Sequence, residues 1–182
     1  MQTKKELRKS AKILRSNLDM VAVSEKFLQV LQSLDFYKKA EHIALYYPLG
    51  TEPNLLALLQ DKSKKFYLPK IQQDNNLTFH PFFEGDILVE NKYSILEPQT
   101  EQINSAILDV IILPALMADF NRHRLGYGKG YYDRFLAKKD ISAIKIICVP
   151  DELMVEKLPV EDFDVQADGV ITPARLIFGD LI

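Results

Sequence analysis

The sequence is poor in residues that many functional sites need. It has one cysteine, Cys148, and three histidines in 182 residues, so it can form neither an internal disulfide nor a thiolate-rich metal centre. The histidines are scattered, without the spacing of metal ligands. Cys148 falls inside an apolar run, which favours a packing role over a nucleophilic one. Sites built on thiolate-bound metals or on a catalytic cysteine are therefore not expected.

Long apolar runs and an excess of one charge are also missing. No run approaches the roughly 20 apolar residues that span a bilayer, and no signal-peptide stretch follows the charged N-terminal segment. Lysine plus arginine number 23 and aspartate plus glutamate 25, a formal net charge of −2, whereas nucleic-acid-binding proteins are typically basic. We therefore expect a cytoplasmic protein that binds neither membrane nor nucleic acid. A monomer is compatible with the sequence, which does not specify the oligomeric state.

The hydrophobic pattern predicts one α/β domain covering residues 1–182. A stripe at Leu7, Ala11, Leu14 and Leu18 predicts a first helix. A second stripe over residues 23–34 predicts another, capped by Asp19 or Ser24. We expect buried strands at 43–47, 65–68, 109–113, 143–149 and 169–172, an edge-like strand at 77–83, and helical runs at 55–59 and 131–137. This alternation indicates a mostly parallel sheet with helices on both faces.

A parallel sheet would bring several motifs to one edge, because the carboxyl ends of its strands lie together. Ligands of such sheets bind beyond the carboxyl ends of the strands. Residues 47–52, Pro69, Lys70 and a glycine-rich segment after residue 113 would lie along this edge. These separate motifs could therefore share one site.

The glycine-rich segment has the composition of a polyphosphate-binding loop. Glycines at positions 126, 128 and 130 leave room for a ligand against the backbone, and successive N–H groups can form an anion-binding nest. Arg122, Arg124 and Lys129 add cations, and a helix start follows. The segment matches neither a Walker A motif nor a dinucleotide fingerprint. The alternative is a solvated glycine turn between a strand and a helix.

Two aspartates could bind Mg²⁺ beside such a phosphate group. Asp133 lies about one turn into the predicted helix, and Asp168 precedes the last predicted strand. Mg²⁺ is commonly held by one or two carboxylates together with phosphate oxygens. The alternatives are that Asp133 offsets the helix dipole and that Asp168 forms a turn with Gly169.

The segment Arg-Leu-Gly-Tyr-Gly-Lys-Gly-Tyr-Tyr-Asp-Arg at residues 124–134 resembles the signature of the 5-formyltetrahydrofolate cyclo-ligases, also called methenyltetrahydrofolate synthetases. Weaker matches run along almost the whole chain in the family's order. They are Lys4 with Arg8, Tyr47 with Glu52, Pro69-Lys70, Glu97-Pro98, and residues 158–164 and 168–172. The chain departs from the family pattern at Arg122 and Ala115, where glycine is common, and at Phe163, where histidine is frequent.

The resemblance implies an ATP- and Mg²⁺-dependent conversion of 5-formyltetrahydrofolate to 5,10-methenyltetrahydrofolate, with ADP and phosphate released. The γ-phosphoryl group would activate the formyl oxygen, and N10 would then close the ring. Arg124 and Lys129 would serve catalysis, and Asp133 and Asp168 would hold the metal. The implied ATP contacts are Lys4, Arg8, Arg124, Leu125, Gly126, Tyr127, Gly128, Lys129, Gly130, Tyr131 and Tyr132. The implied folate contacts are Tyr47, Glu52, Tyr127, Gly128, Lys129, Gly130 and Tyr131.

Residue spacing by itself leaves other readings open. Lys4 and Arg8 share a helix face, which would also suit a solvated basic surface. Glu52 could be a first-turn helix carboxylate, although a carboxylate can also accept the N–H groups of a pterin. The loop tyrosines could be core or rim residues. Two rival functions are a sugar-phosphate isomerase, which would not need ATP, and a nucleotide- or RNA-binding module, whose binding would depend steeply on salt.

Overall fold

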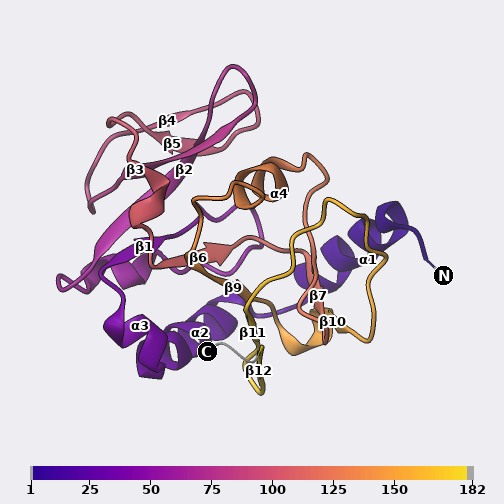
Figure 1. Ribbon diagram of the computed structural model, residues 1–182. Coiled ribbons are helices and arrows are strands. Elements are labelled where there is room, and N and C mark those ends of the chain that lie inside the picture. The colour runs from indigo at the N-terminus through magenta and orange to yellow at the C-terminus, as the bar shows by residue number, and fades with distance from the viewer. Residues whose placement is uncertain (1, 180–182) are drawn as a thin grey trace.

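Figure 1 shows the computed structural model of the protein, which describes residues 2–179. Its centre is a seven-stranded sheet in the order β12-β11-β9-β6-β1-β2-β3. The five strands from β11 to β2 pair in parallel, while β3 and β12 are antiparallel edge strands. The strands are β1 (His42–Ala44), β2 (Lys65–Ile71), β3 (Leu77–Pro81), β6 (Val110–Leu113), β9 (Ile144–Cys148), β11 (Gly169–Ile171) and β12 (Leu176–Phe178).

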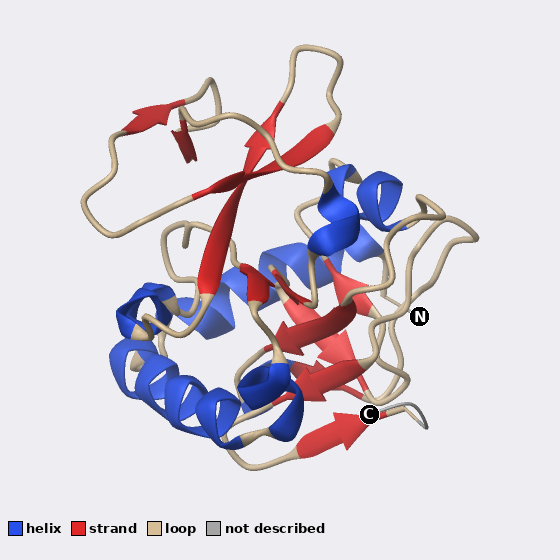
Figure 2. Cartoon of the chain, turned by 60° about the vertical axis from the view of Figure 1, so that its left-hand side comes forward, coloured by secondary structure: helices blue, strands red, loops and turns tan. Residues whose placement is uncertain are grey.

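Helices cover both faces of this sheet, as Figure 2 shows. Helices α1 (Lys4–Ser16) and α4 (Tyr131–Leu136) contribute to one hydrophobic core. Helices α2 (Met20–Ser33) and α3 (Asp35–Lys39) contribute to a second core. The central strand β6 is buried along its whole length because both cores contact it. The predicted α/β architecture is confirmed.

The first two helices are present as predicted, and Asp19 is the cap of the second, but one predicted face is wrong. Thr3 and Glu6 form a capping box at the start of α1, and Asp19 caps α2. On α1 the buried positions are Leu7, Ala11 and Arg15. Leu14 is 41% exposed, whereas Arg15 is 1% exposed. The fourth residue after Ala11, not the third, therefore continues the buried face.

Several elements differ from the predicted pattern in length or were not expected. The helical run at 55–59 is a short 3-10 helix, η1 (Leu56–Gln60), and β2 extends past Pro69 to Ile71. An antiparallel arm of β4 (Leu88–Glu90) and β5 (Leu96–Pro98) was not predicted. Figure 1 shows this arm beside the end of the β2–β3 hairpin, on the same side of the sheet as α4.

A second small sheet positions the glycine-rich segment. Strand β7 (Met117–Asp119) pairs with β8 (Arg124–Leu125) in an antiparallel hairpin and with β10 (Met154–Val155) in parallel. Two further 3-10 turns are η2 (Ser105–Ile107) and η3 (Asp151–Leu153). Among the helices that the structure describes, none combines the length and apolar character needed to span a bilayer.

Candidate active site

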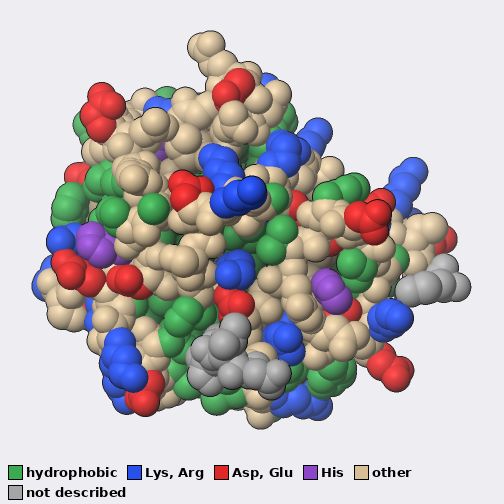
Figure 3. Space-filling view, in the orientation of Figure 1, with side chains coloured by type: hydrophobic (Ala, Val, Ile, Leu, Met, Phe, Trp, Pro, Cys, Tyr) green, Lys and Arg blue, Asp and Glu red, His purple; other side chains and the backbone are tan. Residues whose placement is uncertain are grey.

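A large cavity lies between the glycine-rich segment, the end of the parallel sheet and the β4–β5 arm. Its volume is about 860 Å³, at the upper end of the range for small-molecule sites. Basic side chains gather near the middle of the face in Figure 3, next to carboxylates. The predicted loop cation Arg122 and the predicted metal ligand Asp168 lie outside the cavity lining, whereas the predicted ATP and folate contacts and Asp133 line it together. These lining residues are Lys4, Arg8, Tyr47, Glu52, Arg124, Leu125, Gly126, Tyr127, Gly128, Lys129, Gly130, Tyr131, Tyr132 and Asp133.

The glycines of the loop at residues 124–130, called the glycine loop below, let arginines lie close to the backbone. A Cβ at Gly126 would lie 2.9 Å from Nη1 of Arg124. A Cβ at Gly128 would lie 3.0 Å from Cζ of Arg8. Gly128 and Gly130 also have positive φ values, 95° and 66°, which glycine adopts without strain. Glycine is therefore required here both by conformation and by the approach of a guanidinium group.

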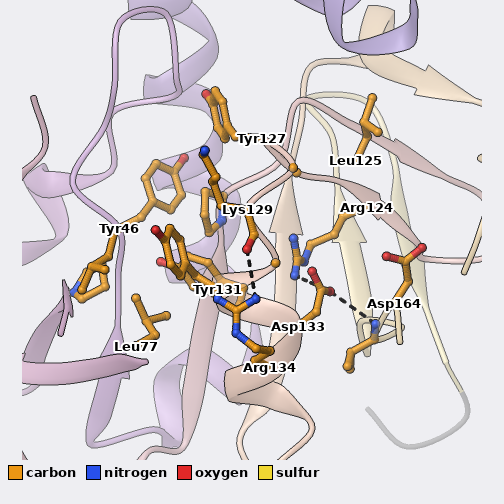
Figure 4. A pocket seen from close by; sticks show the side chains of 18 of the residues that line it. Tyr46, Leu77, Arg124, Leu125, Tyr127, Lys129, Tyr131, Asp133, Arg134 and Asp164 are labelled. Atoms are coloured by element: carbon orange, nitrogen blue, oxygen red, sulfur yellow. Dashed lines mark hydrogen bonds and ion pairs between the residues drawn. The ribbon is translucent and has the colours of Figure 1, made fainter. Parts of the chain in front are cut away.

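Arg124 enters the cavity from β8 and is fixed by Asp133 of α4. The distance from Arg124 Nη2 to Asp133 Oδ1 is 2.7 Å (Figure 4). The guanidinium also lies 5.7 Å from the ring centroid of Tyr132. Arg124 Nε and the Tyr132 hydroxyl are buried and have no hydrogen-bond partner within residues 2–179. Buried polar groups normally have partners, so these two atoms are exceptions, and both belong to residues that line the cavity.

Further cations of the cavity differ in part from those expected. The side chain of Lys129 is exposed in the cavity, with Nζ 5.8 Å from the ring centroid of Tyr93. Arg134 also lines the cavity, and its Nη1 donates to the carbonyl of Lys129 at 3.0 Å. Arg122 instead turns away, with Nε donating to the carbonyl of Ala167. The expected loop cation Arg122 therefore does not line the cavity. Arg8, which was predicted as an ATP contact, and Arg134, which was not predicted, are the arginines beside the loop in addition to Arg124.

Lys4 and Arg8 reach the cavity from the same face of α1. Arg8 Nε donates to the carbonyl of Gly126 at 2.9 Å. Lys4 Nζ lies 2.6 Å from both Glu161 Oε2 and Asp164 Oδ2. Partial burial lowers the pKa of Lys4, but the hydrogen bonds to both carboxylates outweigh it and raise the pKa overall. Arg8 therefore supports the glycine loop directly, while Lys4 is paired with the segment at 161–164.

Glu52, which the sequence predicts as a folate contact, lines the cavity. It is 5% exposed, and its Oε1 accepts from the Tyr127 hydroxyl at 2.8 Å while Oε2 accepts from Leu49 N at 2.8 Å. Burial raises the pKa of Glu52, and these hydrogen bonds and the charge of Arg15 partly offset the increase. Burial and the neighbouring Glu52 charge also raise the pKa of Tyr127. Tyr127 therefore remains a neutral donor to Glu52.

The two predicted metal ligands do not lie together. Asp133 lines the cavity, and its Oδ1 accepts from Arg124 and, at 3.4 Å, from Val165 N. Asp168 lies outside the cavity lining, with Oδ2 2.8 Å from both the backbone N and Nζ of Lys145. In the part of the chain that the structure describes, no group of three His, Cys, Asp or Glu residues could hold a metal ion. Asp133 fits a Mg²⁺ ion bound mainly through phosphate oxygens, while a metal role for Asp168 stays a prediction.

The structure adds cavity residues that sequence reasoning missed. Tyr93 and Ile95 reach the cavity from the turn between β4 and β5, and the Tyr131 hydroxyl donates to the Tyr93 hydroxyl at 3.1 Å. Glu97 also lines it, and its Oε1 accepts from Ile71 N and Asn91 Nδ2. The pair Glu97-Pro98 was noted, but no spacing pattern marked Tyr93. The cavity's aromatic side is therefore larger than the glycine-loop tyrosines alone suggest.

Comparisons with known proteins identify the family of this chain. A model of the 5-formyltetrahydrofolate cyclo-ligase family matches residues 1–173. The chain is 32% identical over 145 residues to the 5-formyltetrahydrofolate cyclo-ligase of Mycolicibacterium smegmatis, covering 73% of this chain and 74% of that protein. It is 34% identical over 134 residues to the enzyme of the same name from Escherichia coli K12, covering 70% and 73%.

A solved structure also matches nearly the whole chain. The NMR structure of 5,10-methenyltetrahydrofolate synthetase from Aquifex aeolicus has a TM-score of 0.85 and 31% sequence identity, covering 97% of this chain and 93% of that one. The sequence match, the structural match and the glycine-loop cavity point to one family of enzymes. This chain belongs to the 5-formyltetrahydrofolate cyclo-ligase family.

Proposed function

We propose that this enzyme converts 5-formyltetrahydrofolate to 5,10-methenyltetrahydrofolate, using ATP and Mg²⁺ and releasing ADP and phosphate. The observation that carries the proposal is the cavity in which the glycine loop lies together with the side chains of Arg8, Arg124 and Lys129. These three side chains are positively charged hydrogen-bond donors beside the loop backbone. Such a set of donors suits a polyphosphate.

The γ-phosphoryl group of ATP is transferred to the formyl oxygen. The bond between the phosphorus and the β–γ bridging oxygen breaks, and a new bond to the formyl oxygen forms. Catalysis of such a transfer consists mainly of positioning and charge stabilisation. Arg124 and Lys129 provide that charge from the glycine loop, and Arg8 holds the loop through Gly126. When bound beside Asp133, Mg²⁺ offsets negative charge on the phosphate oxygens.

Ring closure then needs no nucleophilic side chain. The N10 lone pair attacks the activated formyl carbon, the bond from that carbon to the phosphorylated oxygen breaks, and the N10 proton is lost as phosphate leaves. The protein's role is to hold N10 and the formyl group together and exclude water. Burial raises the pKa of the Cys148 thiol, which lies away from the cavity and takes no part.

The folate occupies the side of the cavity formed by Tyr47, Glu52, Tyr127 and Tyr131. Glu52 accepts N–H groups of the pterin, and the flat ring lies against tyrosine side chains. The two substrates thus meet along residues 127–131, which contact both. The cavity volume of about 860 Å³ lies at the upper end of the range for small-molecule sites, which suits two substrates that meet in one cavity.

A turnover assay with purified protein tests the proposal. Product formation is followed by absorbance and ADP by a coupled assay, with ATP, Mg²⁺ or 5-formyltetrahydrofolate omitted in turn. We expect one ADP per product molecule and no product when any component is absent. The Escherichia coli relative serves as the positive control. Turnover without ATP, or none while the control is active, would refute the proposal.

A further inference from the structure

Arg134 of α4 connects two segments that are distant in the sequence and that both border the cavity. Its Nη1 donates to the carbonyl of Lys129 in the glycine loop at 3.0 Å (Figure 4). Its Nη2 donates at 3.3 Å to the carbonyl of Asn75, which lies in the turn between β2 and β3. The residues on either side of this turn, Ile71 and Leu77, line the cavity together with Arg134. One guanidinium group therefore joins the glycine loop to the β2–β3 turn.

The carbonyl that Arg134 holds lies between two positions of high backbone freedom. Lys129 is flanked by glycines with positive φ, 95° at Gly128 and 66° at Gly130. Glycine can also adopt many other conformations, because it has no Cβ. Gly130 is the N-cap of α4, and no side chain caps that end of the helix. The bond from Arg134 therefore restrains the Lys129–Gly130 peptide where the chain itself restrains it least.

The β2–β3 turn is a firm anchor for this restraint, because its own hydrogen bonds close it. Gln72 N donates to the carbonyl of Asn76, and Asn75 N donates to the carbonyl of Gln72, each at 2.9 Å. The Asp74 carboxylate accepts from both the backbone N and Nδ2 of Asn76. Arg134 thus ties the glycine loop to a turn whose shape is fixed independently of the loop.

A held carbonyl also fixes the direction of an amide donor. The Lys129–Gly130 peptide is trans, so the carbonyl of Lys129 and the N–H of Gly130 point in opposite directions. Within residues 2–179, none of the N–H groups of residues 126–130 donates to a backbone acceptor. Successive N–H groups of this kind can bind an anion. Arg134 occupies the carbonyl side of the peptide and leaves its N–H side for a ligand.

Arg134 differs from the other cavity cations in how its guanidinium is used. Both terminal nitrogens donate to protein carbonyls, and Cζ lies 5.3 Å from the ring centroid of Tyr131. A Cβ at Gly130 would lie 3.0 Å from Nη1, so glycine at this position also makes room for the arginine. We propose that Arg134 is a positioning residue, which holds the Lys129–Gly130 peptide in the orientation that lets Lys129 and the loop amides bind the triphosphate of ATP. This inference rests on the proposed function.

The test compares Arg134→Met and Arg134→Lys with wild type. Methionine removes both bonds, whereas lysine keeps the charge but cannot reproduce the fork of two nitrogens that meets two carbonyls. In both variants we expect the Kd for MgATP, measured by isothermal titration calorimetry, to rise about tenfold or more. KM for 5-formyltetrahydrofolate should stay within about threefold of wild type. Wild-type affinity for MgATP in Arg134→Lys would mean that charge alone matters and would overturn the inference.

Lys138→Met is the matched control for the loss of an exposed cation. Lys138 follows α4, and its Nζ lies 5.2 Å from the ring centroid of Phe135, but it does not line the cavity. This variant should bind MgATP as wild type does. If Arg134→Met instead weakens both substrates equally and lowers Tm, Arg134 serves stability alone and the inference fails.

A double variant tests whether Arg134 acts through the loop. In a Lys129→Ala background, Arg134→Met should raise the Kd for MgATP by less than about threefold, because part of what Arg134 positions is already gone. A rise as large as in the wild-type background would show that Arg134 acts elsewhere. Wild-type protein that binds MgATP but gives no turnover would refute the proposed function and leave the positioning role intact.

Discussion

The contact between Arg8 and Gly128 can be tested by adding one methyl group. Gly128 has φ 95°, and a Cβ there would lie 3.0 Å from Cζ and 3.1 Å from Nη2 of Arg8. Gly85 provides a matched control, because its φ is 93° and no atom lies within 4 Å of its Cβ position. Gly128→Ala and Gly85→Ala therefore carry the same backbone strain. Only Gly128→Ala also displaces Arg8.

The expected losses of stability and activity follow from two effects, the backbone strain of alanine and the displacement of Arg8. An alanine in the left-handed region costs about 1–2 kcal/mol, and about 2–4 °C of Tm is lost per kcal/mol in a protein of this size. Both variants should therefore melt several degrees lower than wild type. Displacing Arg8 disturbs its bond to the carbonyl of Gly126. A charge-assisted hydrogen bond contributes about 1.5–3 kcal/mol, so kcat/KM for ATP should fall roughly ten- to a hundredfold in Gly128→Ala.

Steady-state kinetics with ATP as the varied substrate, together with thermal melts of all three proteins, give the answer. Gly85→Ala should keep wild-type kcat/KM for ATP despite its lower Tm. If Gly128→Ala also keeps it, within about twofold of Gly85→Ala, then the approach of Arg8 to the glycine loop has no role in ATP use. Loss of activity in both variants would attribute the effect to strain instead.

Three other substitutions test the remaining charges. Lys129→Ala removes a cavity cation, so ATP use should weaken about ten- to a hundredfold in a folded protein; unchanged ATP kinetics would exclude a phosphate role. Asp133→Asn should slow turnover at least about tenfold and move the Mg²⁺ titration to higher concentration. A lower Tm with an unchanged titration would mean that Asp133 pairs with Arg124 but does not bind the metal. Asp168→Asn weakens the contact with Lys145 and should cost about 0.5–1.5 kcal/mol in the free energy of unfolding. Its Mg²⁺ titration should match wild type if this contact is its role, whereas a shifted titration would make Asp168 the second metal ligand.

The site could be predicted where its residues are contiguous. The glycine loop and Asp133 fall within ten consecutive residues. The backbone conformation of the loop requires glycine at particular positions, and these glycines can be recognised in the sequence. Strand β6, which precedes the small sheet that carries the loop, was also predictable, because it is a continuous apolar run. These predictions succeeded because each depends on a pattern in neighbouring residues, either closely spaced glycines or a continuous run of apolar residues. The short strands β7 and β8 of that small sheet were not predicted.

The positions of Leu14 and Arg15 show where such patterns fail. Spacings of three and four residues both continue a helical face, so hydrophobicity favoured Leu14 for the core. The structure buries Arg15 instead, since its guanidinium meets two carbonyls 100 residues away in the sequence. No local pattern contains those acceptors. Tyr93 was not predicted as a site residue for a similar reason. The β4–β5 arm is too short to give a clear sequence pattern, and the contact of Tyr93 with Tyr131 depends on tertiary packing.

The long-range contacts of α1 have a consequence for how the chain folds during synthesis. Lys4, Arg8 and Arg15 bind acceptors that follow them by 160, 118 and 100 residues. At a synthesis rate of about 5–20 residues per second, α1 is synthesised about 5–30 s before these acceptors. A 13-residue helix is marginal by itself in water. Helix α1 therefore docks late, and the cavity that it lines is among the last parts of the molecule to form.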